Sequence, residues 1–401
     1  MSNINKTLSK LLEYRQRSLD LYKFTLPNLY KIRTRGPSKF KLLKLEIILR
    51  ICIFHHYFSI SRKLPRYIFS SMRFPLLMST MQPKEVMVMG GVKEFIFCLK
   101  NGYRFYWMGP IYYGFNLFIF SGKNNLFDSV ITILRKIFSK DTNKRYLFLL
   151  NDQHPAEMTL SFALEDSPKL NIVCISHGML SFETTGQKDA NDGESCKFNF
   201  VWSDSQKSFF TTERNYASFT LGLPYEVYQA QSQCKEVILV GHCGVSSDIL
   251  NYCHSVYHFI SIYQALEKVG IKVFYRPHPQ DDFDLAQEVF SNISVMDKNV
   301  LLASARRVYI GFESTLVFEA REFGNISIGL DSLEIQDARA FDVDFEVSSD
   351  NFESLPGLIL DIFHKNESKK NDKYGNLKTR FDRCINQIDE FNATYKFDER
   401  N

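Results

Sequence analysis

The sequence predicts an α/β protein that folds into two domains, each built on a parallel sheet. At 401 residues the chain exceeds what a single hydrophobic core usually serves. Apolar runs of strand length alternate with segments of helical spacing, which is typical of parallel sheets with crossover helices. The stretch 222–233 lacks strong periodicity and separates two such series, so we expect the hinge there. We therefore expect Rossmann-like domains at 76–228 and 235–365, after a basic helical extension at 1–75 and before a charged helical tail at 366–401.

The first domain shows a series of apolar runs separated by helical patterns. The runs predict strands at 84–91, 103–107, 115–120, 145–150, 170–175 and 198–202. Helical spacing predicts helices at 128–138 and 155–164 and a further helix from Ser205. Because strands and helices alternate, we expect a parallel sheet in this domain.

The second domain repeats the alternation. Apolar runs predict strands at 236–240, 271–275, 308–310 and 326–330, with a long helix at 248–269 and another around 316–324. Gly241 opens the glycine turn Gly-His-Cys-Gly after the first of these strands, as in many nucleotide-binding units. The turn lacks the full dinucleotide fingerprint, so Gly241 is a weak candidate for a nucleotide-binding position.

Two polar segments of the second domain follow predicted strands directly. They are Phe274–Gln280, which contains His278, and Gly311–Ala320, which contains Ser314 36 residues after that histidine. The carboxyl ends of parallel strands meet at one edge of a sheet, where open α/β folds bind ligands. These side chains are therefore expected at a common site.

The residue types at this site suit a phosphate. Pro277 and Pro279 restrict the backbone on either side of His278, which preorganises the imidazole. Ser314 and Thr315 open a helical stretch, and a helix N-terminus offers N–H groups to an anion. An imidazole and hydroxyl or backbone donors could stabilise charge that develops on a phosphate leaving group. The alternatives are a rigid turn closed by a histidine and plain N-capping by Ser314.

These residues also carry a family resemblance. Arg276-Pro-His-Pro279, Ser314-Thr315 and Glu319 resemble the His-Pro and Ser-Ser/Thr motifs of bacterial sialyltransferases, polysialyltransferases and Kdo transferases. The resemblance spans roughly residues 145 to 330. It implies the GT-B fold, in which two Rossmann-like domains face a central cleft and the C-terminal helix crosses back onto the first domain.

The resemblance also implies roles for the motif residues. The phosphate of a CMP-sugar would be bound by His278 and Pro279 of the first motif and by Ser314 and Thr315 of the second. Glu319 would reach the ribose. Glycerol-phosphate polymerases that use CDP-glycerol share both motifs, so they remain a close alternative.

The general base of an inverting transfer is expected in the first domain, near the acceptor hydroxyl. The resembling sialyltransferases have a pair of acidic residues followed by glycine after a strand. This chain has Ser176-His177-Gly178 there, and a histidine that titrates near neutrality suits the role. Asp152 and Asp192 are the alternatives: the first follows a predicted strand, and the second keeps half of the acidic motif in a predicted loop.

Charge is concentrated at the beginning of the chain. Residues 1–73 contain 16 Lys and Arg against three acids, so this segment carries +13 although the whole protein carries +4. The apolar stretch 42–58 is interrupted by Lys44, Glu46 and Arg50, which makes it unsuited to span a bilayer. It could lie on an anionic membrane surface, pack as a helix of the first domain, or form a nucleic-acid patch. No nucleic-acid recognition motif accompanies the charge, so we expect no nucleic-acid partner.

The cysteines and metal-binding residue types point to a reduced protein without a metal. Eight cysteines are scattered without a Cys-x-x-Cys pair, and we see no secretory signal, so we expect a cytoplasmic protein peripherally associated with the inner membrane. His55 and His56 are adjacent and would not face one way on a helix. We see no Asp-x-Asp that would hold Mg²⁺ on a nucleotide diphosphate, so we expect no cofactor beyond the CMP-sugar donor.

Together these features predict an inverting GT-B glycosyltransferase. It would transfer sialic acid or a related acidic sugar from a CMP-sugar to a surface glycan such as O-antigen or capsule, with a lipid-linked oligosaccharide as one form of acceptor. The alternatives are transfer of glycerol phosphate from CDP-glycerol, another hexosyl transfer on the same fold, and a non-catalytic scaffold that resembles a glycosyltransferase.

Overall fold

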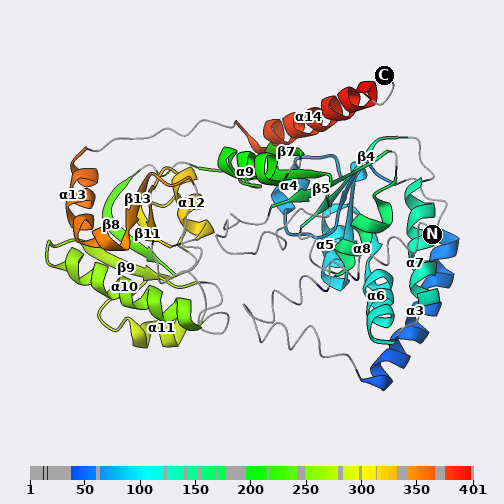
Figure 1. The fold of residues 1–401 in the computed structure, drawn as a ribbon, viewed down its shortest axis with the longest axis horizontal. Coiled ribbons are helices and arrows are strands. Elements are labelled where there is room, and N and C mark those ends of the chain that lie inside the picture. The colour runs from blue at the N-terminus through cyan, green and yellow to red at the C-terminus, as the bar shows by residue number, and fades with distance from the viewer. Residues whose placement is uncertain are drawn as a thin grey trace. The chain divides into compact units, whose positions relative to one another are not determined.

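A computed structural model of the chain divides into two compact units (Figure 1). The first unit runs through Tyr225 and takes up the chain again from Asn376, and the second spans Glu226–Gly375. The structure describes residues 12, 16, 38–59, 64–121, 124–139, 143–150, 155–167, 169–176, 196–214, 217–228, 230, 232–241, 249–278, 283–297, 300–312, 314–331, 342–365 and 375–398. Each unit holds one parallel sheet with helices on both faces, which confirms the fold class of two α/β domains.

The first unit contains a seven-stranded sheet with the strand order β3-β2-β1-β4-β5-β6-β7. Its strands are β1 (Tyr67–Phe69), β2 (Val86–Gly90), β3 (Arg104–Trp107), β4 (Arg145–Leu149), β5 (Leu170–Ile175), β6 (Phe198–Val201) and β7 (Ala217–Thr220). All pairings are parallel. The strand order reverses between β1 and β4, which is the topological switch point of the sheet.

Alternating residues of these strands supply two separate cores, one on each face of the sheet. Ile68 and Leu147 face one core, and the neighbouring Tyr67 and Tyr146 face the other. The first core is covered by α3 (Lys39–Ser59), α6 (Gly109–Ser121), α7 (Asn124–Ser139) and α8 (Pro155–Leu164). The second is covered by α4 (Pro75–Ser79), α5 (Val92–Asn101) and α14 (Leu377–Asp398). The helix α9 (Asp204–Arg214) connects β6 and β7.

Two elements of the first unit differ from the sequence expectation. The apolar run 115–120, expected as a strand, lies inside α6, where Phe115 and Leu117 are buried. A short apolar run fits a buried helix as well as a strand, so periodicity alone could not separate them. Residues 67–69, which the prediction placed in the N-terminal extension, form β1 at the centre of the sheet. With three residues, that strand is too short to show an alternating pattern.

The helix α3 packs against α6 and α7, so part of the expected extension belongs to the first unit. Leu49 is fully buried, and Glu46 is buried beside Arg50, whose guanidinium lies 2.9 Å from its carboxylate. The opposite face exposes apolar side chains and two basic ones: Phe40, Leu43, Lys44, Ile47, Arg50 and Ile51. Within the described part of the chain, no helix has the length and apolar character needed to cross a bilayer.

The second unit contains a six-stranded sheet with the strand order β10-β9-β8-β11-β12-β13. Its strands are β8 (Gln233–Val240), β9 (Lys272–Arg276), β10 (Ser294–Val295), β11 (Arg306–Gly311), β12 (Ile326–Asp331) and β13 (Phe345–Ser348). The order again reverses once, between β8 and β11. Each unit therefore has the chain path of a Rossmann domain.

The helices of the second unit also cover both faces. One core is formed with α10 (Ile249–Glu267), α11 (Phe283–Val289) and α13 (Leu355–Lys365), and the other with α12 (Thr315–Glu322). A 3-10 helix, η3 (Ser349–Ser354), precedes α13. The single helix α12 therefore lies opposite the larger helical layer.

The C-terminal helix α14 packs on the first unit (Figure 1). Its buried Arg380 donates hydrogen bonds to the carbonyl oxygens of Leu221 (3.0 Å), Leu223 (2.8 Å) and Tyr225 (3.0 Å). The hydroxyl of Tyr146 donates to Asp389 at 2.6 Å. The helix is therefore fixed to the segment through which the chain leaves the first unit.

Candidate functional site

The candidate site lies at the carboxyl ends of β9, β8 and β11, which are neighbours at the centre of the second sheet. In register, Val240 of β8 lies opposite Arg276 of β9 and opposite Gly311 of β11. The residues that follow these three strands therefore emerge at the same level. We call this group, Gly241, His278, Ser314 and Thr315, the strand-end site.

Gly241 lies directly against the backbone that carries His278. Its N–H donates to the carbonyl oxygen of Arg276 at 2.9 Å. A Cβ at position 241 would lie 2.7 Å from the backbone nitrogen of His278 and 2.8 Å from the hydroxyl of Tyr275. Tyr275 is buried and stacks on Phe290 with ring centroids 4.0 Å apart, so it has little room to move. Glycine at 241 is therefore what allows the His-Pro segment to approach β8.

The imidazole of His278 is half-buried at the end of β9. Burial lowers its pKa from the ordinary value, because desolvation disfavours the charged form. At neutral pH the ring is therefore neutral and can donate a hydrogen bond through one nitrogen. A bound anion would favour the imidazolium and raise the pKa again.

Ser314 forms the N-cap of α12 through its backbone. Its φ and ψ of −133° and 122° are extended, and its carbonyl oxygen accepts from the Val317 N–H at 3.0 Å. The Ser314 hydroxyl makes no capping hydrogen bond. Plain side-chain capping therefore does not account for the serine. Thr315 begins the helix and Glu319 lies one turn later, both partly exposed.

Gly311 brings the start of α12 close to the sheet. A Cβ at this position would lie 3.0 Å from a methyl group of Val317 and 3.2 Å from Val240. A larger residue would push α12 away from β8. Gly311 therefore lets α12 pack close to β8, and Gly241 lets the turn after β8 pack against the end of β9.

The sequence reasoning selected further residues that lie outside the described part of the chain. They are the three candidate bases, His177, Asp152 and Asp192, and Pro279 of the His-Pro motif. The strands that precede two of these bases are described: β4 ends at Leu149, before Asp152, and β5 ends at Ile175, before His177. Ser176, next to His177, is buried and accepts a hydrogen bond from the indole N–H of Trp202 at 2.7 Å.

Sequence reasoning missed a pair at the switch point of the first sheet. Ser70 follows β1, and Glu157 lies in the first turn of α8 after β4; both are buried. The Ser70 hydroxyl donates to the Glu157 carboxylate, and the Leu150 N–H donates to the same oxygen at 3.0 Å. This carboxylate joins the ends of the two strands at which the order reverses. The pair of Ser70 and Glu157 was not predicted because the strand β1, which precedes Ser70, was not predicted.

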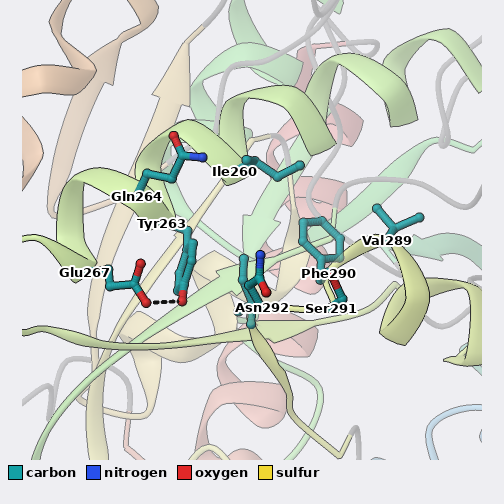
Figure 2. A pocket seen from close by; sticks show the side chains of 9 residues that line it. Ile260, Tyr263, Gln264, Glu267, Val289, Phe290, Ser291 and Asn292 are labelled. Atoms are coloured by element: carbon teal, nitrogen blue, oxygen red, sulfur yellow. Dashed lines mark hydrogen bonds between the residues drawn. The ribbon is translucent and has the colours of Figure 1, made fainter.

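A pocket of about 370 Å³ lies elsewhere in the second unit (Figure 2). It lies between α10 and the end of α11, where Tyr263 donates a hydrogen bond to Glu267. Glu267 precedes β9 and Ile293 precedes β10, so the pocket lies at the amino ends of these strands. It is therefore on the opposite edge of the sheet from the strand-end site.

Within the described residues, no group of three His, Cys, Asp or Glu side chains is arranged to hold a metal ion. Six of the cysteines are free thiols: Cys98, Cys174, Cys196, Cys234, Cys253 and Cys384. Burial raises the pKa of Cys98 to about 11 and that of Cys384 to about 12, so neither is a thiolate at neutral pH.

Known proteins resemble this chain in fold. No family model and no curated protein sequence matches it. The Methanocaldococcus jannaschii UDP-GlcNAc 2-epimerase, solved with UDP-GlcNAc and UDP, is similar over 82% of this chain and 100% of its own, with 13% identity and a TM-score of 0.46. The spinosyn rhamnosyltransferase SpnG, solved with spinosyn aglycone, covers 80% of this chain and 95% of its own, with 10% identity and a TM-score of 0.38.

A chain of the GtfA/B complex is also similar, over 65% of this chain, with 11% identity and a TM-score of 0.39. The present chain spans 57% of the length of that chain. At these identities and TM-scores the likeness carries no conclusion about function, which has to be inferred from the strand-end site itself.

Proposed function

We propose that this protein is an inverting glycosyltransferase that transfers sialic acid or a related acidic sugar from a CMP-sugar to a surface glycan. The observation that carries the proposal is the convergence of Gly241, His278 and the Ser314–Thr315 pair at the carboxyl ends of three adjacent strands. They lie beside the switch point of a Rossmann unit, where such folds bind nucleotides.

The proposed chemistry follows from the hydrogen-bond donors that converge at this site. As the glycosidic bond of the donor breaks, negative charge builds on the phosphate of the leaving group. The imidazole of His278, the Ser314 hydroxyl and the N-terminus of α12 would stabilise that charge. A sugar nucleotide with one phosphate suits this small set of hydrogen-bonding groups. We propose that transfer needs no metal.

The choice of CMP rests on the resemblance of Arg276-Pro-His-Pro279 and Ser314-Thr315 to the motifs of CMP-sugar enzymes. Glu319 lies one helical turn beyond Thr315, within reach of a group bound at the start of α12. We propose that it contacts the ribose.

We assign the proton acceptor to the first unit. His177 is our first choice, with Asp152 and Asp192 as the alternatives. The base would take the proton of the acceptor hydroxyl while the anomeric carbon is attacked from the face opposite the phosphate. A lipid-linked glycan acceptor would place the reaction at the cytoplasmic face of the inner membrane. The apolar and basic outer face of α3 supports such peripheral attachment.

Nucleotide-dependent thermal stabilisation tests the donor directly. CMP should raise the unfolding temperature, whereas UDP and GDP at the same concentration should not, because stabilisation follows affinity for the folded state. His278→Ala should abolish the CMP response, and the control His364→Ala, on the exposed side of α13, should retain it. A response to UDP alone would overturn the proposal, and a response to CDP-glycerol with turnover of that compound would favour glycerophosphate transfer.

A transfer assay separates the enzyme from a scaffold. Hydrolysis or transfer from a CMP-sugar is expected for the wild type, and its absence despite CMP binding would support a non-catalytic role. Alanine substitution of His177, Asp152 and Asp192 in turn should identify one variant that binds CMP normally and loses turnover.

A further inference from the structure

The helix α5 exposes an apolar stripe, of which Phe95 also packs edge-on against Phe105 of β3 with ring centroids 5.3 Å apart. Val92, Phe95, Ile96 and Leu99 are 74%, 43%, 48% and 68% exposed. Their spacing places them on one face of the helix. The buried side of α5 is formed instead by Cys98, which belongs to the core beneath it. The helix therefore carries apolar residues on two faces, of which the core covers only one.

Two basic side chains flank this stripe. Lys93 and Lys100 are exposed next to it on α5. Glu94 is the single acid of the sequence 92–107, and its carboxylate accepts the Gly91 N–H at 2.8 Å at the helix N-terminus. Positive charge therefore prevails around the apolar stripe.

Aromatic residues with polar atoms extend the same surface. Trp107 ends β3, the edge strand, and lies opposite Gly90 of β2, just before α5 begins. Its indole is 37% exposed, and it packs edge-on against Tyr113 with ring centroids 6.1 Å apart. Trp and Tyr are the residues that favour the headgroup level of a bilayer.

We infer that this α5–β3 surface, formed by Val92, Phe95, Ile96, Leu99 and Trp107 with their basic neighbours, inserts into the headgroup region of an anionic membrane. The apolar stripe would enter the boundary of the acyl chains, the indole of Trp107 would lie at the headgroups, and Lys93 and Lys100 would face lipid phosphates. A second copy of the chain fits less well, because a two-fold contact through this surface would bring the same positive rim against itself.

This surface is distinct from the outer face of α3. The helix α5 covers the core that contains Tyr67 and Tyr146, whereas α3 covers the core on the other face of the sheet. The inference rests on the proposed function only in one respect, that a lipid-linked acceptor would give the protein a reason to bind a membrane. The physical claim concerns vesicle binding and holds or fails without any transfer.

Co-sedimentation with vesicles tests the α5–β3 surface. The full chain should bind vesicles containing anionic lipid more tightly than neutral ones. The double variant Val92→Glu/Leu99→Glu should reduce partitioning at least about tenfold, because two apolar side chains are replaced by charges that anionic lipid repels. The control Val269→Glu/Leu301→Glu makes the same charge change at exposed apolar residues of the second unit and should bind nearly as the wild type does.

Tryptophan fluorescence locates the contact. The protein has two tryptophans, of which Trp202 is buried and Trp107 is exposed. Lipids brominated near the headgroup should quench Trp107 when the protein binds, and Trp107→Phe should remove most of that quenching while vesicle binding persists. Binding without quenching would show that another surface makes the contact and would overturn the inference.

The remaining outcomes separate this inference from the proposed function and from self-association. Transfer to a soluble acceptor with no vesicle binding would overturn the membrane surface and leave the enzyme standing. Vesicle binding with Trp107 quenching but no CMP response would support the surface and remove the proposed donor. A wild-type dimer that Val92→Glu/Leu99→Glu converts to a monomer, with vesicle binding unchanged, would assign the surface to a second copy and overturn the inference.

Discussion

At the scale of single residues, the strand-end site depends on how closely a histidine and a glycine approach each other. His278 was predictable from the sequence because two prolines flank it after an apolar run. The role of Gly241 was predictable only as a weak motif, because its packing against the backbone of His278 and against Tyr275 requires knowledge that β8 and β9 are neighbours.

The pKa of His278 predicts how donor binding depends on pH. In the free protein burial holds this pKa below its ordinary value, and a bound phosphate would raise it. Binding therefore takes up a proton, so affinity should increase as the pH falls from the bound-state pKa toward the lower free-state pKa, by at most about tenfold per pH unit. Calorimetric titration with a non-hydrolysable CMP-sugar analogue at several pH values measures this slope. An equal slope in His278→Gln would show that another group takes up the proton.

Gly241→Ala is expected to displace the His-Pro segment. The added methyl group would lie 2.7 Å from the backbone nitrogen of His278, so the backbone has to move. We expect a loss of about 1 to 3 kcal/mol in the free energy of unfolding, measured by urea denaturation, together with a weaker CMP response. Gly357→Ala is the control, because a Cβ at that position meets nothing within 4 Å. If Gly241→Ala binds CMP as the wild type does, this close contact is not part of the binding site.

At the scale of elements, prediction succeeded where a run was long and its boundaries were marked. The expected strand at 170–175 and the helix that begins at Pro155 have the bounds that the structure shows. Prediction failed at the run 115–120, which belongs to a buried helix, and at β1, which is three residues long. In both cases the tertiary surroundings, rather than the local pattern, decide the structure.

Arg380 of α14 provides a test at this scale. Its guanidinium is buried and donates to three carbonyl oxygens at the end of the first unit. Arg380→Ala should lower the free energy of unfolding of the first unit by about 2 to 4 kcal/mol, because these buried acceptors lose a charged donor. Arg383→Ala, on the exposed side of the same helix, should change it by less than about 0.5 kcal/mol. Denaturation followed by the fluorescence of Trp202, which lies in the first unit, measures both. Equal effects would mean that α14 is held by its apolar side alone.

At the scale of the whole molecule, the proposed reaction assigns donor binding to the second unit and the general base to the first. The residues proposed for the strand-end site of the second unit were predicted from the sequence, because their polar segments follow long, recognisable strands. It could not identify Ser70 and Glu157 in the first unit, because one of their two strands was not recognisable. Contacts between residues 87 positions apart depend on topology and leave no local pattern.

Glu157→Gln should separate turnover from donor binding. The carboxylate fixes the Leu150 N–H, directly before the sequence that contains Asp152. Glutamine keeps one acceptor oxygen but loses the charge, which weakens the hydrogen bonds that Ser70 and Leu150 donate to residue 157. We expect this strand end to shift, and small shifts near a reacting group cost about 10- to 100-fold in rate. The CMP response of the second unit should stay unchanged, and Glu165→Gln, at an exposed position after α8, should leave both properties intact. A parallel loss of CMP response would reveal general destabilisation instead.

The return of α14 to the first unit has a consequence for biosynthesis. The ribosome makes the entire second unit between β7 and the helix that completes the first unit. The core around Phe381 and Ile385 therefore lacks α14 until that helix has been synthesised, whereas every described strand of the second unit has been made before it. The second unit can thus complete its fold before the first unit does. A chain truncated before Asn376 would expose the apolar surface that α14 covers.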